Sequence, residues 1–226
     1  TKKIITIEDP VEYELSGINQ IPVNPKRGLT FASGLRSILR QDPDVIMVGE
    51  IRDRETADIS VRSALTGHLL FSTIHTNDAA SAVGRLIDME VEPFLLGSVL
   101  EGVVAQRLGR RLDPEQADLA PIPDAVRHRL HPQELALFPD GMAMQPRTTG
   151  AGATTGYRGR LGFYEILSIS GALREAVGAR KPAHELLKLA GASHVTMRRD
   201  GLRKAAEGLT SIDEVLRATQ DADDAI

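Results

Sequence analysis

Residues 41–53 read QDPDVIMVGEIRD and contain the clearest buried strand of the chain. Four consecutive apolar residues, 45–48, follow Pro43 and end at Gly49-Glu50. A short apolar run that is rich in β-branched residues and does not alternate is typical of a strand covered on both faces, as in a parallel sheet. The run places Glu50 directly after the carboxyl end of the predicted strand.

Two further apolar runs flank this strand in the sequence. Residues 3–7 (KIITI) are followed by Glu8-Asp9-Pro10, and residues 69–74 (LLFSTI) are followed by His75. Helices are predicted between the runs and after them, over about 31–42, 54–65 and 79–89. Strands that alternate with helices predict an α/β fold, in which a parallel sheet has helices on both faces.

The sequence changes in character from about residue 113. Six prolines between residues 114 and 146 and the glycine-rich stretch 150–156 predict an irregular insertion or mobile linker. A strand is then predicted over 161–169, and helices are predicted to begin near Ala172, Ala183, Val195 and Ser211. The last helix opens with Ser211-Ile212-Asp213-Glu214, which fits a capping box.

Charged side chains and histidine follow the three apolar runs. In parallel sheets ligands bind outside the carboxyl ends of the strands, so these residues are the candidates for chemistry. An apolar strand that ends in an acid, as the strand before Glu50 does, can deliver a carboxylate to the magnesium ion or attacking water of a nucleoside triphosphate. The same pattern also fits an exposed acid at a strand end. His68 and His75 lie seven positions apart and face opposite sides of a strand, so they are not expected to bind one metal together.

Taken together, these motifs resemble those of the secretion ATPases, the superfamily that powers type II secretion and type IV pili. Residues 41–53 resemble the Walker B signature of that superfamily, residues 5–13 its aspartate box and residues 67–77 its histidine box, in the same order. The resemblance continues through 105–108, 156–162, 200–202 and 211–219, and leaves out only about 113–154.

The resemblance implies a division of the chain into three parts. Residues 1–112 would form a RecA-like P-loop NTPase core, with the aspartate box, Walker B and the histidine box. Residues 113–155 would be an irregular insertion at the position of the family's zinc subdomain. Residues 156–226 would form a smaller, mostly helical C-terminal subdomain.

The resemblance also implies roles for four acidic residues. Glu50 would be the Walker B glutamate and Glu12 the aspartate-box glutamate, one polarising water and the other helping to position magnesium and water. Which of the two acts as the base is left open. Glu8 and Asp9 belong to the aspartate box, and they also fit a simple turn before Pro10.

Two histidines and an arginine complete the implied site. By resemblance His75 would lie near the γ-phosphate and sense it, while His68 would link its strand to the neighbouring strands. Arg52 is a candidate for an inter-subunit or structural ion pair, and Arg62 fits a solvated surface pair better.

ATP and Mg²⁺ are the expected cofactors, and zinc is not expected. Many members of the superfamily carry two Cys-x-x-Cys pairs within the segment that corresponds to about 110–155. This chain contains no cysteine, which excludes thiolate zinc sites, disulfides and cysteine nucleophiles. His128 and His131 lie three apart, but two histidines without cysteine partners make a poor zinc site.

The phosphate-binding loop Gly-x-x-x-x-Gly-Lys-Ser/Thr does not occur in these 226 residues, which contain no Gly-Lys pair. We expect this piece upstream of Thr1, so that the chain is the C-terminal part of a longer motor. These residues alone are then expected to hydrolyse ATP negligibly.

The function expected from the resemblance is that of a type II secretion ATPase, which drives pseudopilus assembly and protein export. It would act as a homo-oligomer, expected to be a hexamer, in the cytoplasm and peripherally on the inner membrane, with the membrane platform proteins as partners. A type IV pilus assembly ATPase is the alternative. A RecA-like nucleic-acid motor is disfavoured because aromatic residues make up only 4% of the chain and the net charge is −4. A non-catalytic docking fragment is a further alternative. Every apolar run is far shorter than the roughly 18 residues of a membrane-spanning helix.

Overall fold

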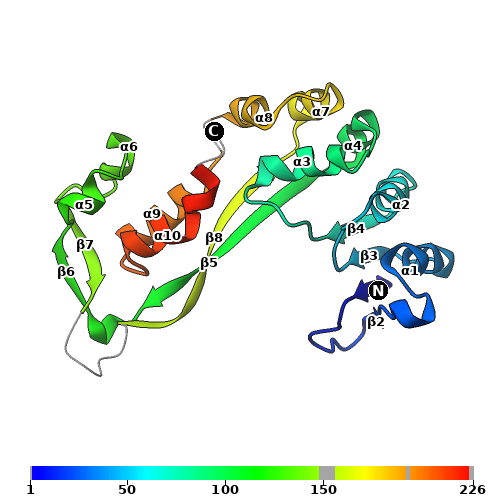
Figure 1. Ribbon diagram of the computed structural model, residues 1–226, viewed down its shortest axis with the longest axis horizontal. Coiled ribbons are helices and arrows are strands. Elements are labelled where there is room, and N and C mark those ends of the chain that lie inside the picture. The colour runs from blue at the N-terminus through cyan, green and yellow to red at the C-terminus, as the bar shows by residue number, and fades with distance from the viewer. Residues whose placement is uncertain (1, 148–155, 192–193, 224–226) are drawn as a thin grey trace. The chain divides into compact units, whose positions relative to one another are not determined.

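The computed structural model describes residues 2–147, 156–191 and 194–223 (Figure 1). The chain forms two compact units, and each unit is made of three separate stretches of the sequence. Unit 1 comprises residues 1–76, 80–101 and 168–189, and unit 2 comprises 77–79, 102–167 and 190–226. The boundaries of these two units differ from those of the three parts inferred from the sequence motifs. The three-part division stays a prediction.

A four-stranded parallel sheet forms the centre of unit 1. Its strands are β1 (Ile4–Glu8), β2 (Asn19–Pro22), β3 (Val45–Val48) and β4 (Leu69–Ser72), in the order β2-β1-β3-β4. Ile7 pairs with Val48 and Val48 with Ser72, so the carboxyl ends of β1, β3 and β4 lie level with one another. The predicted α/β fold with a parallel sheet is confirmed.

Helices α1 (Phe31–Ile38) and α2 (Arg54–Leu65) pack on one face of the sheet, where Ile5, Ile7 and Ile46 are fully buried. Thr30 caps α1 and Asp53 caps α2 by accepting a backbone N–H of the first turn. Short 3₁₀ helices lie at Pro25–Arg27 and Leu39–Gln41. Unit 1 also contains α3 (Ala79–Asp88) beyond its first residue, together with α4 (Pro93–Val99), α7 (Gly171–Gly178) and α8 (Ala183–Ala190).

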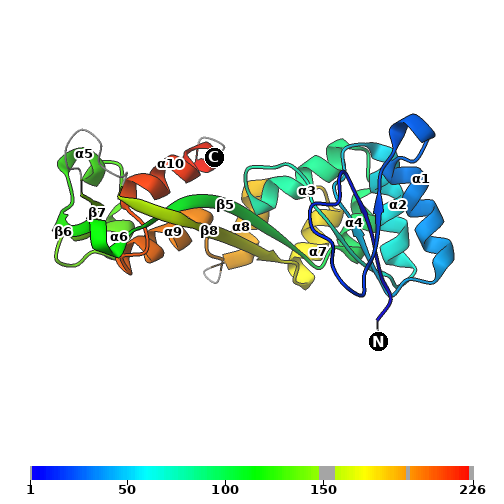
Figure 2. The same cartoon turned by 90° about the horizontal axis from the view of Figure 1, so that it is seen from below.

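Two long strands, β5 (Gly102–Leu112) and β8 (Tyr157–Ser168), pair along unit 2 (Figures 1 and 2). We call this pair the ribbon. Helices α9 (Met197–Ala206) and α10 (Ile212–Asp223) pack on one side of it around the fully buried Phe163. A Cβ atom at Gly109 of β5 would lie 2.5 Å from the Phe163 ring, so only glycine at this position leaves room for the ring. The strand predicted over 161–169 is confirmed by β8, whereas β5 was not predicted.

The segment predicted as irregular is regular up to residue 147, and that prediction is wrong for the described part. Strands β6 (Ala117–Pro121) and β7 (Met142–Pro146) pair antiparallel. The segment also forms a 3₁₀ turn (Pro114–Gln116) and helices α5 (Asp124–Arg127) and α6 (Pro132–Leu135). Its apolar side chains Ile122, Val126, Leu130, Phe138 and Ala143 join the cluster that contains α9 and α10. Proline spacing alone did not reveal this packing. Most of the glycine-rich stretch lies outside the described residues.

Candidate functional site

Backbone contacts bring the carboxyl ends of β1, β3 and β4 together. The N–H of Gly49 donates to the carbonyl of Ile7 at 2.7 Å, and a Cβ atom at Gly49 would lie 3.1 Å from the same carbonyl oxygen. Glycine therefore lets the end of β3 lie close against β1. The Thr73 hydroxyl donates to the Gly49 carbonyl at 2.6 Å, and the N–H of Ile51 donates to the Thr73 carbonyl at 3.0 Å. The segments that follow β3 and β4 are thus fixed to each other.

Glu50 is the centre of the polar cluster at this edge. Its side chain is 12% exposed, and one carboxylate oxygen, Oε1, forms an ion pair with Arg52. The other oxygen, Oε2, lies 3.4 Å from Nε2 of His75. Arg52 also approaches Asp9, with Nη1 3.9 Å from Oδ2. The structure therefore brings together Glu50, Arg52, Asp9 and His75, which come from three different strand ends.

The ionisation of Glu50 is controlled mainly by Arg52. The hydrogen bond from Arg52 lowers the pKa of Glu50 below its usual value, against the opposing effect of burial. The same contact raises the pKa of Arg52. Glu50 is consequently an ionised carboxylate at neutral pH. Among the described residues nothing forms a hydrogen bond with its Oε2 atom, which is buried.

This orphaned oxygen fits the cofactor that the motifs imply. Mg²⁺ takes oxygen ligands and keeps several of its waters, so a carboxylate oxygen without a donor can bind either the ion or a water molecule. Glu50 supplies that oxygen, and Asp9, 42% exposed, supplies a second carboxylate on the far side of Arg52. Within the described residues, no cluster of three or more His, Asp or Glu side chains forms a metal site from protein ligands alone.

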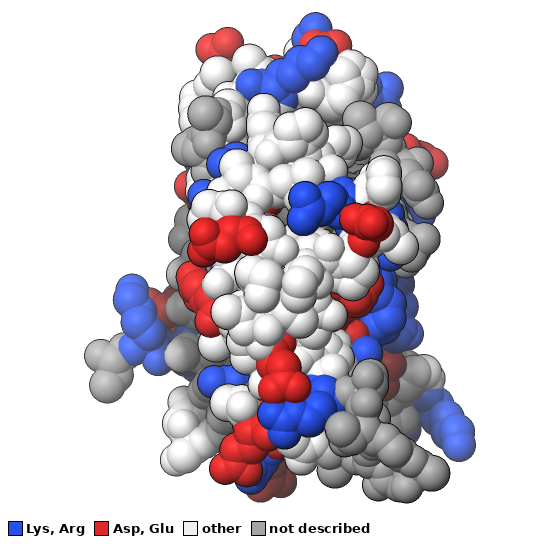
Figure 3. Space-filling view, turned by 90° about the vertical axis from the view of Figure 1, so that its left-hand side faces the viewer, with Lys and Arg blue, Asp and Glu red and all other residues white. Residues whose placement is uncertain are grey.

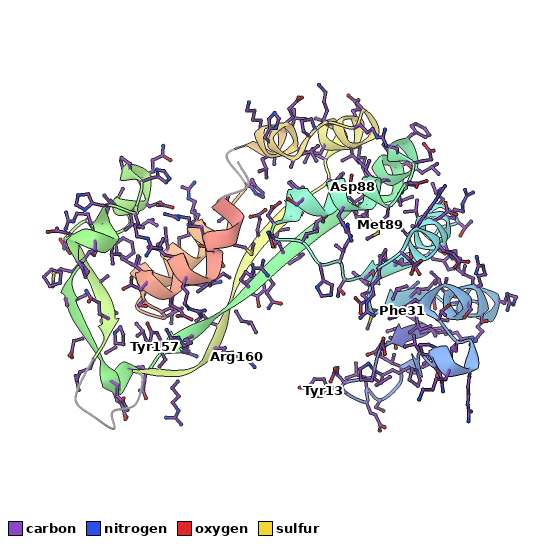
Figure 4. The ribbon with its side chains drawn as sticks, viewed as in Figure 1. Tyr13, Phe31, Asp88, Met89, Tyr157 and Arg160 are labelled. Atoms are coloured by element: carbon purple, nitrogen blue, oxygen red, sulfur yellow. The ribbon has the colours of Figure 1, made fainter. Side chains whose placement is uncertain are left out.

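The remaining predicted site residues, Glu8, Glu12 and His68, have other surroundings. Glu8 is buried and accepts hydrogen bonds from Thr6 and from Gln20, the latter at 3.0 Å, so it stabilises the sheet edge. Glu12 is exposed and precedes Tyr13, which is 81% exposed and extends away from the strands (Figure 4). His68 lies at the other end of β4 from His75, and its Nδ1 atom is 3.1 Å from the Ser63 carbonyl.

Three residues noted in the sequence have local surface contacts. Arg62 pairs with Asp58 one turn earlier on α2, at 2.8 Å, where both side chains are at least half exposed. His128 contacts the Asp124 carbonyl, and His131 lies at the start of α6.

Sequence reasoning missed the residues that hold the segment after His75. Asn77 accepts a hydrogen bond from Arg107, and the N–H of Ala79 donates to Glu165. One signal was available, because Phe163, Glu165 and Leu167 alternate along the predicted strand. That spacing places the Glu165 carboxylate on the buried face.

Comparisons with known proteins agree with the fold and the motifs. The family model described as "Type II/IV secretion system protein" matches residues 1–217. Type II secretion system protein E of Xanthomonas campestris pv. campestris is 51% identical over 229 residues, which cover 97% of this chain and 39% of that protein. The type IV pilus assembly ATPase PilB of Thermus thermophilus is 48% identical over 223 residues, covering 96% of this chain and 24% of that protein.

The solved structures show the same architecture. The pilus retraction motor PilT with bound ADP superposes with a TM-score of 0.71 and 28% identity, over 99% of this chain and 54% of PilT. The ATPase DotB of Legionella pneumophila, at 22% identity and a TM-score of 0.63, has the same fold. In the part of the chain that the structure describes, no helix has the length and apolar character needed to cross a membrane. The chain spans about two fifths of the type II secretion E proteins that it matches. From residue 1 to residue 217, this chain belongs to the type II/IV secretion system protein family.

Proposed function

We propose that the full-length protein hydrolyses ATP and that this hydrolysis drives type II secretion. The observation that carries the proposal is the position of Glu50, an ionised carboxylate with one oxygen lacking a hydrogen-bond donor, next to His75. The 51% identity to type II secretion system protein E supports secretion as the process, and the 48% identity to PilB keeps type IV pilus assembly as the alternative.

In this proposal each residue of the cluster has a separate task. Glu50 orients the attacking water and accepts its proton through Oε2, while Arg52 holds Oε1 and so fixes the plane of the carboxylate. His75, whose Nε2 atom lies 3.4 Å from Oε2 of Glu50, would contact the terminal phosphate. Glu12, on an exposed loop, would help to position the ion and its waters when nucleotide is bound. When bound, Mg²⁺ supplies charge neutralisation on the phosphate oxygens.

Residues 1–226 contain no Gly-Lys pair and therefore no phosphate-binding loop of the Gly-x-x-x-x-Gly-Lys-Ser/Thr type, so we propose that another part of the full-length protein supplies this loop. We therefore expect these residues alone to hydrolyse ATP negligibly. We also propose that the full-length protein works as a hexamer on the cytoplasmic side of the inner membrane, together with the membrane proteins of the secretion machine.

A nucleic-acid motor is a weaker explanation of the same fold. Such motors track the backbone of a single strand with a continuous basic groove and stacked aromatic residues. On the face shown in Figure 3, acidic and basic side chains are interspersed. Aromatic residues make up 4% of the chain, and its net charge is −4.

Substitution of Glu50 by Gln in the full-length protein tests the proposal. Gln keeps the size of the side chain but cannot accept a proton, so we expect kcat to fall by about 10²- to 10⁴-fold while ATP affinity stays the same. Steady-state phosphate release and equilibrium binding of a labelled ATP analogue measure the two quantities. Asp58→Asn, which neutralises an exposed carboxylate on α2, is the matched control and leaves both unchanged.

The same assay decides between the two glutamates. If Glu50→Gln retains its kcat while Glu12→Gln loses it, the base is Glu12 and the role given to Glu50 is wrong. If neither substitution changes kcat, the proposed hydrolysis at this edge of the sheet is wrong.

A further inference from the structure

Thr73 is the first residue after β4, and its hydrogen bonds lie on both sides of Glu50. Its hydroxyl donates to the carbonyl of Gly49, the residue before Glu50, at 2.6 Å. Its own carbonyl accepts a hydrogen bond from the N–H of Ile51, the residue after Glu50, at 3.0 Å. A single residue therefore binds the backbone on either side of the proposed catalytic carboxylate.

The regular pairing of β3 with β4 ends just before these contacts. The two strands lie side by side in Figure 1, and Val48 and Ser72 form the last pair between them. Beyond this pair, the Thr73 hydroxyl supplies a side-chain donor for the Gly49 carbonyl, while the N–H of Gly49 donates to the carbonyl of Ile7 on β1 at 2.7 Å. Because Gly49 is bound on one side to β1 and on the other to Thr73, the backbone that leads into Glu50 is fixed.

His75 follows Thr73 by two residues, and packing does little to hold its side chain in place. That side chain is 89% exposed, although its Nε2 atom lies 3.4 Å from Oε2 of Glu50. Among the described residues nothing forms a hydrogen bond with this Oε2 atom. The distance between the two side chains consequently depends on how their backbones are joined. Thr73 joins them, since it binds the residues on both sides of Glu50 and lies two positions before His75.

We propose that the Thr73 hydroxyl is a positioning group for ATP hydrolysis, which holds Glu50 and His75 at the distance that the reaction requires. The inference rests on the proposed function. Thr73 acts through the backbone next to Glu50 and His75 and needs no contact with the nucleotide. All three residues, together with Gly49 and Ile51, belong to unit 1.

Substitution of Thr73 by Val in the full-length protein tests the inference. Val has nearly the same shape as Thr but no hydroxyl, and at this exposed position it neither empties nor crowds the core. A displacement of a catalytic group by about 1 Å can cost about 10²-fold in rate, and the remaining contact with Ile51 limits the movement, so we expect kcat to fall by about 5- to 50-fold. ATP affinity should stay the same, because the alignment of Glu50 with His75 changes and the binding of nucleotide does not.

Two further substitutions separate the hydroxyl of Thr73 from its methyl group. Thr73→Ser keeps the donor and should keep kcat within about twofold of the unmodified protein, whereas Thr73→Ala should lose as much as Thr73→Val does. In a His75→Ala background, Thr73→Val should lower kcat by a further factor of at most about two, because no imidazole is left to align with Glu50.

Thr66→Val is the matched control for a purely structural role. Thr66 is also an exposed residue of unit 1, it lies before the other end of β4, and it takes no part in the proposed reaction. Its hydroxyl likewise donates to a backbone carbonyl, that of Ser63, at 2.8 Å. Assayed well below its melting temperature, this control should keep kcat within about twofold.

The inference is wrong if kcat stays within about twofold of the unmodified protein in both Thr73→Val and Thr73→Ala. It is also wrong if Thr73→Ser or the Thr66→Val control loses as much as Thr73→Val, or if the losses of Thr73→Val and His75→Ala are additive. Weaker ATP binding with an unchanged kcat would make Thr73 a nucleotide ligand instead of a positioning residue. Failure of the proposed function is a separate result, because it appears as an unchanged kcat in both Glu50→Gln and Glu12→Gln.

Discussion

Glu50 and Glu214 are both paired with arginine, but their surroundings give them different chemistry. The side chain of Glu214 is fully buried, and its two oxygens accept hydrogen bonds from Arg110 and Arg217. Glu50 has one oxygen held by Arg52 and one that is not hydrogen-bonded among the described residues. A carboxylate whose oxygens are all engaged can hold elements together, whereas one with a vacant oxygen can accept a proton or bind a ligand.

Glu214 carries a measurable part of the stability of unit 2. Burial alone raises the pKa of this carboxyl, but the hydrogen bonds from Arg217 and Arg110 outweigh burial and lower it from 4.5 to about 2. A lowered pKa stabilises the folded state fully above the pKa of the unfolded chain, and this stability is lost as the pH falls from about 5 towards 2. At about 1.4 kcal/mol per pKa unit, the contribution at pH 7 is roughly 3–4 kcal/mol.

We therefore expect Glu214→Gln to lower the free energy of unfolding by roughly 3–4 kcal/mol at pH 7. Urea unfolding of the 226-residue chain at a series of pH values measures the effect. The difference from the unmodified chain should shrink between pH 5 and 2, and a constant difference over that range would contradict the assignment. Asp118→Asn removes a pair with Arg147 in which both side chains are about half exposed, and should lower the free energy of unfolding far less than Glu214→Gln does.

At the level of single elements, capping residues and apolar periodicity in the sequence predicted α1, α2 and α3, whereas α4 was not predicted. The helix predicted over 54–65 matches α2, and Thr30 caps α1 as predicted. Of the two hydrogen bonds in the capping box predicted at Ser211, the structure has one. The Ser211 hydroxyl accepts the N–H of Glu214 at 3.2 Å, but the Glu214 carboxylate binds arginines of β5 and α10 instead of turning back to the helix start.

Close packing of two helices explains why one glycine of α4 is required. A Cβ atom at Gly97 would lie 2.7 Å from the carbonyl oxygen of Arg174 and 3.1 Å from the backbone nitrogen of Gly178, both on α7. Because backbone atoms of a packed helix cannot move away as a flexible side chain can, α4 and α7 would have to separate.

Gly97→Ala should therefore destabilise unit 1 by about 1–3 kcal/mol. Chemical denaturation of the purified 226-residue chain provides the measurement. Gly84→Ala on α3 is the matched control, since it has open space around its Cβ position and should stabilise the helix by up to about 1 kcal/mol. If both variants changed the free energy of unfolding by the same amount, the α4–α7 contact would not be tight.

At the scale of the whole molecule, residues 113–147 are held in place without any cysteine, by packing and by an ion pair. Nε of Arg198 on α9 donates to Oε1 of Glu134 on α6 at 2.6 Å, and Nη2 donates to the Arg129 carbonyl at 2.7 Å. Burial raises the pKa of Glu134, but the hydrogen bonds from Arg198 and from the backbone N–H of His131, together with the charge of Arg198, outweigh burial, so the pKa lies below its usual value. The apolar side chains of residues 122–143 join the core around α9 and α10.

Removal of metal should consequently leave this segment intact. We expect the melting temperature of the 226-residue chain to be the same with and without EDTA, because none of these contacts needs a metal ion. Glu134→Ala, in contrast, should lower the melting temperature by several degrees, since it leaves the Arg198 guanidinium without its carboxylate partner. A transition that falls in EDTA and returns with added Zn²⁺ would disprove this account.

The sequence determined the features that depend on neighbours along the chain. Apolar runs, together with the capping and turn residues that end them, predicted β1, β3, β4 and the helices between them. The order of the motifs indicated the family. The same local patterns placed Glu50, Asp9 and His75 at strand ends. In the structure Glu50 lies beside His75, and Arg52 links Glu50 to Asp9. Parallel strands bring their carboxyl ends to one edge, so this part of the site followed from periodicity alone.

Only the tertiary structure decided the contacts between residues far apart in sequence. Glu165 bonds to Ala79 across 86 residues, and Glu214 bonds to Arg110 across 104. It also showed that residues 113–147 form strands and helices around a shared core, where proline spacing had predicted an irregular insertion. Local propensity carries no information on which buried donor will meet which acceptor, because that pairing is fixed by how whole elements pack.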